Sequence, residues 1–149
     1  MDTDRIEKTV VLRAPRARVW RALARADEFG AWFGVALEGV FAPGARLTGR
    51  IITPDHARLT MEIAVERVEP EQLLAYRWHP YAVEPDVDYT DEPTTLVEFH
   101  LADVADGTRL TVVESGFDGI PLARRATAFR MNDQGWTEQL TRIAHYVAA

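Results

Sequence analysis

The carboxyl-terminal part of the sequence, residues 121–147, constrains the fold most, because its apolar residues recur with a helical period. The stripe consists of Phe129, Trp136, Leu140, Ile143 and Val147. A long helix with one apolar face needs an apolar surface to lie on, and a twisted sheet curved around the helix supplies one. The pattern therefore predicts one long helix packed against a sheet.

Most of the preceding chain alternates apolar and polar residues with a period of two, which is typical of strands. Residues 14–34 are different, because their period and their glycines indicate two short helices. Short alternating runs, separated by turn residues, follow this segment and favour antiparallel strands. The runs that predict strands include residues 5–13, 58–68, 73–80, 94–101 and 109–117. We predict a single α+β domain over residues 1–149, with a curved antiparallel sheet of about seven strands wrapped around the long helix.

Composition excludes several classes of function. The net charge of −6 argues against general nucleic-acid binding, and the absence of cysteine excludes disulfides and thiolate metal sites. No apolar run is long enough to span a bilayer, so we expect a cytoplasmic protein. No phosphate-binding, dinucleotide-binding or zinc-protease motif is present, and we expect no cofactor and no metal. The histidines are scattered along the sequence: His56, His79, His100 and His145.

Four short motifs, in this order, resemble a known family. They are "APRARVWRAL" (14–23), "WFG" (32–34), "GTRLTVVESGF" (107–117) and "GW" (135–136). Over about residues 5–148 the chain resembles bacterial proteins related to the activator of the heat-shock-protein-90 ATPase. These belong to the START-like, birch-pollen-allergen-like (SRPBCC) superfamily. The resemblance implies a helix-grip fold with a cavity between sheet and helix, where members bind lipids, hormones or polyketides and some act as cyclases or hydrolases.

Glu114 is the polar residue that the strand pattern makes conspicuous. In the strand predicted over residues 109–117 it shares a face with Leu110 and Val112, which both belong in a core. One interpretation is a solvated strand end paired with an arginine, since buried carboxylates are rare without a partner. The other places Glu114 at the cavity, as a hydrogen-bonding group or a general base whose pKa burial would raise.

Asn132 interrupts the apolar stripe of the long helix and must find a hydrogen-bond partner. Gly135 lies in the interior of the same helix despite a cost of about 1 kcal/mol, which predicts that another group packs close to it. Aromatic residues on inward faces would either fill the core or hold an apolar ligand. The candidate ligand-binding residues are Trp32, Phe33, Trp78, Phe99, Glu114, Phe129, Asn132 and Trp136.

Three functional hypotheses follow. The first is a binding protein for a small hydrophobic or amphipathic ligand, with no catalytic residue. The second is a cyclase-type or hydrolase-type enzyme with Glu114 as general base. The third is a chaperone-related or stress-related module that docks another protein through the outer face of the sheet or through the long acidic interval 79–93, which is also a candidate lid. The chain could act as a monomer or a homodimer.

Overall fold

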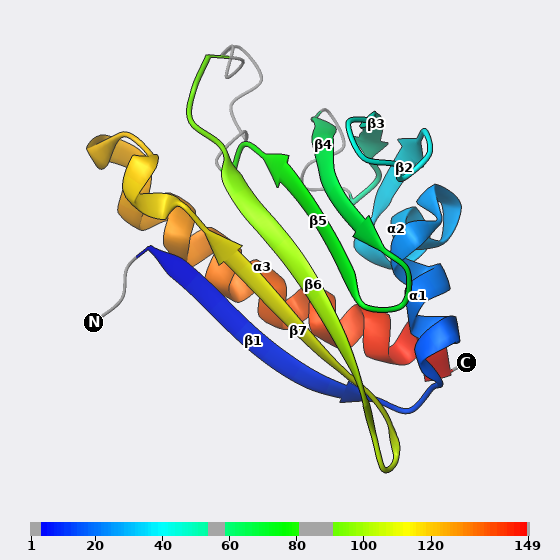
Figure 1. Cartoon of the computed structure of the whole chain (residues 1–149). Coiled ribbons are helices and arrows are strands. Elements are labelled where there is room, and N and C mark those ends of the chain that lie inside the picture. The colour runs from blue at the N-terminus through cyan, green and yellow to red at the C-terminus, as the bar shows by residue number, and fades with distance from the viewer. Residues whose placement is uncertain (1–3, 54–58, 81–90, 149) are drawn as a thin grey trace.

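The computed structural model describes residues 4–53, 59–80 and 91–148. These residues form a seven-stranded antiparallel sheet in the spatial order β1-β7-β6-β5-β4-β3-β2 (Figure 1). The first and last strands in the chain are thus neighbours in the sheet, since β1 pairs with β7 over its whole length. The strands are β1 (Arg5–Leu12), β2 (Val35–Glu38), β3 (Arg46–Ile51), β4 (Thr60–Glu69), β5 (Leu73–Trp78), β6 (Thr95–Val104) and β7 (Gly107–Ser115).

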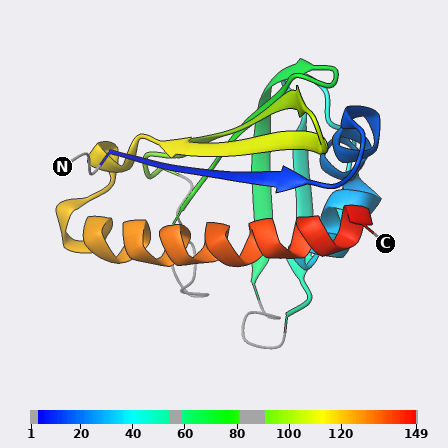
Figure 2. The same cartoon turned by 90° about the horizontal axis from the view of Figure 1, so that it is seen from below.

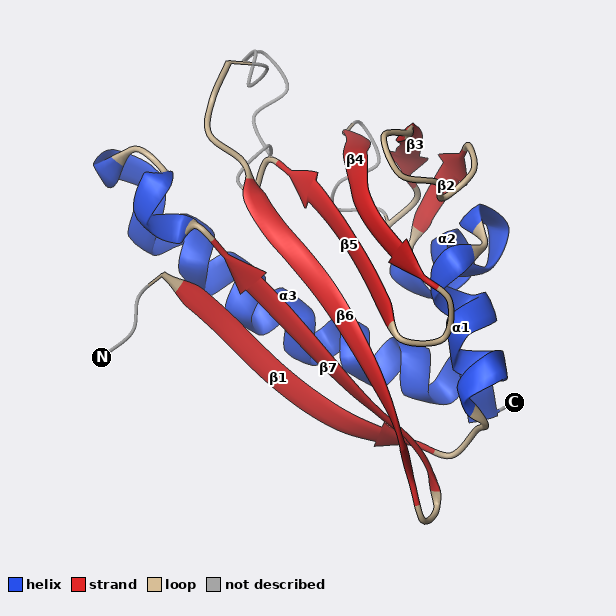
Figure 3. Ribbon diagram, in the orientation of Figure 1, coloured by secondary structure: helices blue, strands red, loops and turns tan. Residues whose placement is uncertain are grey.

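The long helix α3 (Leu122–Ala148) lies along one face of this sheet, as Figure 2 shows from below. Two short helices, α1 (Arg16–Ala24) and α2 (Ala26–Phe33), connect β1 to β2 and lie at the end of the sheet near the carboxyl end of α3 (Figure 3). A single 3₁₀ turn, η2 (Phe117–Gly119), joins β7 to α3. The predicted α+β helix-grip fold, with two short helices after the first strand, is confirmed.

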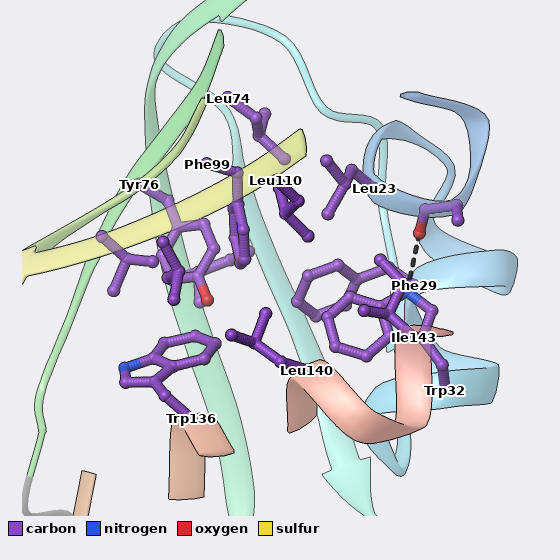
Figure 4. Close-up of a cluster of buried hydrophobic side chains, with 14 of the residues drawn as sticks. Leu23, Phe29, Trp32, Leu74, Tyr76, Phe99, Leu110, Trp136, Leu140 and Ile143 are labelled. Carbon is purple, nitrogen blue, oxygen red and sulfur yellow. Dashed lines mark hydrogen bonds between the residues drawn. The ribbon is translucent and has the colours of Figure 1, made fainter. Parts of the chain in front are cut away.

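The core lies between the sheet and the helices, because each element turns its apolar face inward. Phe29 of α2 contacts Trp32 edge to face, and the Trp32 indole donates to the carbonyl oxygen of Ala22 at 2.9 Å (Figure 4). On the sheet side, Tyr76 and Phe99 are fully buried.

No helix in the described part of the chain is long and apolar enough to cross a membrane.

The sheet opens between β4 and β5, and this opening positions the site described below. Their pairing runs from Glu69↔Leu73 to Ala64↔Arg77, with a shift in register between Val65 and Arg67. The residues at the start of β4, which precede Ala64 in the sequence, pair with no described residue of β5. They still pair with β3. The two strands therefore separate toward this edge, as Figure 1 shows.

Candidate ligand-binding site

Glu114 is a fully buried carboxylate held by four neutral donors. Its Oε1 accepts from Trp136 Nε1 at 2.8 Å, and its Oε2 accepts from Trp78 Nε1 at 2.8 Å and from Thr95 Oγ1 at 2.5 Å. Asn132 Nδ2 lies 3.0 Å from both oxygens. No arginine, lysine or histidine among the described residues forms an ion pair with it, so the arginine-paired interpretation of Glu114 is wrong.

Sheet register and helical spacing explain why these donors converge. Glu114 pairs with Val97 of β6, and Thr95 lies two residues before Val97, so its side chain points to the same face. Trp78 pairs with Thr95 across the next ladder and shares that face. From the other side, Asn132 and Trp136 are four residues apart on α3 and therefore project together.

Burial has a measurable consequence for the charge of Glu114. Desolvation raises the pKa of its carboxyl above the ordinary 4.5, while the hydrogen bonds from Thr95, Trp78, Trp136 and Asn132 lower it and offset only part of that effect. The neighbouring Tyr76 is also fully buried, and its hydroxyl has no hydrogen-bond partner among the described residues. Burial, and then the nearby charge of Glu114, raise the pKa of the Tyr76 phenol well above 10.

A cleft of about 610 Å³ lies where β4 and β5 separate and reaches the face of α3. Its apolar wall contains aromatic and thioether groups, and charged side chains of the sheet form its rim. Two of the Glu114 donors, Trp78 and Asn132, line it, whereas Glu114 is not itself among its lining residues. The cleft is also lined by Phe33, Met61, Ile63, Arg77 and Met131.

A second, smaller pocket of about 160 Å³ adjoins the helix and is called the aromatic pocket here. It is lined by Phe33, Trp78, Asn132, Gly135, Trp136 and Gln139. A Cβ built on Gly135 would meet nothing within 4 Å, so the prediction that another group packs close to Gly135 is wrong. The glycine instead leaves open space in the wall of the aromatic pocket.

The sequence-based candidates thus divide into two groups. Phe33, Trp78, Asn132 and Trp136 line the cleft or the aromatic pocket, and Glu114 is hydrogen-bonded to the last three without lining either. The others line neither, because they are used elsewhere. Trp32 and Phe99 are buried core residues, and Phe129 packs against Phe117 with ring centroids 5.2 Å apart.

Sequence reasoning did not select Thr95, Tyr76, Met61 or Met131. Thr95 and Met61 carry no distinctive signal, since threonine and methionine are ordinary on a sheet face. Tyr76 does share the inward face of its strand with Trp78, which was a usable signal. The described residues contain no cluster of three or more histidine or carboxylate groups that could hold a metal ion. Residues 81–90 of the acidic interval lie outside the described residues.

Replacing Gly135 with alanine should stabilise the protein by about 1 kcal/mol, because alanine has the higher helix propensity and its Cβ meets open space. Chemical denaturation of both proteins measures the difference. Gly30→Ala is the matched control in α2, where the new Cβ would lie 2.1 Å from the carbonyl oxygen of Val35. We expect Gly30→Ala to destabilise the fold, and a loss of stability in Gly135→Ala would contradict the open space at that position.

Comparison with known proteins agrees with this architecture. DynU16, a protein in the dynemicin biosynthetic locus, is 26% identical over 98% of this chain, with a TM-score of 0.75; the match covers 48% of DynU16, so the chain spans about half of that protein. Protein MLL2253 from Mesorhizobium loti is 22% identical, with 97% of this chain and 96% of that one covered and a TM-score of 0.76. A protein from Arthrobacter aurescens reaches a TM-score of 0.81 at 15% identity, with 99% and 89% covered.

A search of curated proteins finds no significant match. The family model named Activator of Hsp90 ATPase homolog 1-like protein, however, matches residues 13–148, nearly the whole chain. The match includes α1, α2, every strand from β2 to β7 and α3, and therefore all residues of the cleft and the aromatic pocket. The chain belongs to the family of Activator of Hsp90 ATPase homolog 1-like proteins.

Proposed function

We propose that this protein binds a small apolar or amphipathic ligand in the cleft between the sheet and α3. The observation that carries the proposal is the cleft itself: about 610 Å³, within the usual size range of small-molecule sites. Phe33, Trp78, Met61 and Met131 provide apolar and polarisable contact area. The proposal also fits DynU16, a similar protein encoded in a biosynthetic locus.

The hydrogen bonds at Glu114 support binding rather than base catalysis. A general base needs a free lone pair within reach of the substrate proton. Both oxygens of Glu114 already accept hydrogen bonds, and the residue is fully buried behind Trp78 and Asn132. In the proposed function Glu114 is a positioning residue, which fixes the orientation of the two side chains that line the cleft.

Native mass spectrometry of the protein purified from its own host tests this proposal, followed by extraction of any bound small molecule. We expect a discrete added mass that is lost in Met131→Trp, because the larger side chain fills the mouth of the cleft from the exposed face of α3. Leu122→Trp is the matched control, since Leu122 is an exposed apolar residue of the same helix that does not line the cleft.

Retention of the added mass in Met131→Trp would place the ligand elsewhere and contradict the proposal. A bare chain mass from cells grown under several conditions, together with no binding of added apolar probes, would contradict it as well. The interaction-module hypothesis would then be preferred, and a pull-down with and without residues 80–93 would examine it.

A further inference from the structure

The aromatic pocket presents three aromatic rings to a space of a few heavy atoms. The ring centroids of Trp78 and Trp136 lie 5.7 Å apart, and that of Phe33 lies 6.1 Å from Trp78 and 6.2 Å from Trp136. A water molecule occupies about 30 Å³ in the liquid, so a pocket of about 160 Å³ accommodates a small head group. Gly135 keeps one wall of the pocket free of a side chain.

The charge next to the aromatic pocket is negative. Both indoles that line it donate their N–H groups to the buried Glu114 carboxylate, which has no cationic partner among the described residues. A hydrogen bond to an anion polarises the donor, so the ring faces become better partners for a positive charge. No arginine, lysine or histidine is among the described lining residues. Arg142 contacts the Phe33 carbonyl oxygen at 3.5 Å but does not line the pocket.

Gln139 forms a further part of the wall of the aromatic pocket. Its Nε2 donates to the Phe33 carbonyl oxygen at 3.0 Å, which fixes the amide orientation. Its Oε1 is buried with no hydrogen-bond partner among the described residues, and it presents no surface to the pocket.

We propose that the aromatic pocket binds the protonated amine of an amphipathic ligand whose apolar part occupies the cleft. The aromatic rings and the charge of Glu114 favour a cation. The two spaces share Phe33, Trp78 and Asn132, so one ligand can occupy both. This inference rests on the proposed function and names the chemical class of its ligand.

Three probes of equal chain length test the proposal: octylamine, 1-octanol and octanoate at neutral pH. Binding is followed through the indole N–H resonances of Trp78 and Trp136 in two-dimensional NMR spectra. We expect octylammonium to bind about tenfold more tightly than octanol, as cation–π contacts of this kind provide. Octanoate should bind more weakly than either.

A variant that fills the aromatic pocket tests whether the preference for the amine arises there. Gly135→Leu projects a side chain into the open space and should abolish the preference for octylammonium while octanol still binds. Gln134→Leu is the control, because Gln134 is exposed on the same helix and does not line the pocket. Equal affinities for octylammonium and octanol, or a preference that survives Gly135→Leu, would overturn the amine assignment alone. Failure of octanol to bind as well would count against the proposed function too.

Discussion

Replacing Glu114 with glutamine should lower the free energy of unfolding by about 2–4 kcal/mol at neutral pH, although the two side chains have the same shape. The reason is that the donors around residue 114 need an acceptor at both positions of its terminal group. Glutamine offers one carbonyl oxygen and one NH₂ group, whereas the carboxylate accepts at both oxygens. Whichever way the amide is turned, its nitrogen faces the indole N–H of Trp78 or of Trp136.

The control for this variant is Glu7→Gln. Glu7 is exposed on β1, where it forms an ion pair with Arg5, and exposed ion pairs contribute about 0–1 kcal/mol. Urea denaturation of the three proteins at one pH gives the comparison. A change in Glu114→Gln no larger than that in Glu7→Gln would mean that the donors are satisfied without the carboxylate, and it would remove the assigned positioning role.

The pH dependence of the same difference reports the charge of Glu114. Its pKa is raised in the folded protein, so between the unfolded and folded pKa values the folded state binds more protons than the unfolded state. The stability linked to the proton on Glu114 is therefore fully present below about pH 4.5 and is lost as the pH rises through the folded pKa, while the hydrogen bonds that the carboxylate accepts remain. The destabilisation by Glu114→Gln should accordingly be larger at acid pH. Asp27 and Glu28, whose pKa values are lowered, titrate in both proteins and cancel.

The period of the sequence was sufficient to predict most of this fold, because alternation and helical spacing report which face of each element is buried. The same argument placed Glu114 beside Leu110 and Val112 on the inward face of β7 and singled out Asn132 on α3. It could not decide between an arginine partner and a cavity, since a strand pattern contains no information on what faces the strand across the core.

Two features of the site depend on tertiary structure that no local pattern encodes. The cleft exists because the β4–β5 pairing ends at Ala64 and Arg77, while the alternation of β4 continues unchanged to Met61. Gly135 was interpreted as a close contact because a helical glycine usually has a packing reason, yet it faces open space. In the proposed amine site, this open space accommodates the ligand.

The largest loss of stability is expected for Trp136→Ala, at about 3–5 kcal/mol, because the substitution removes a buried indole and leaves a cavity. Trp136 packs against Trp78 and Phe99, with ring centroids 5.7 Å away in each case, and it donates to Glu114. Trp136→Phe separates these contributions, because phenylalanine retains most of the ring contact and loses the donor. We expect Trp136→Phe to cost about 1–3 kcal/mol.

The hydrogen bond of Trp136 can be distinguished from its packing by pH. Removing a donor from Glu114 raises the folded pKa of the carboxyl further, so the destabilisation by Trp136→Phe should grow as the pH rises through that pKa, the opposite direction to Glu114→Gln. Trp20→Phe is the control, since Trp20 is half-buried on α1 and donates to no carboxylate among the described residues. A pH-independent cost for Trp136→Phe would mean that packing alone holds Trp136. A cost of Trp136→Phe that grows with pH would show that the Trp136 indole stabilises the ionised form of Glu114, whereas the opposite trend of Glu114→Gln would report the raised pKa of the carboxyl itself.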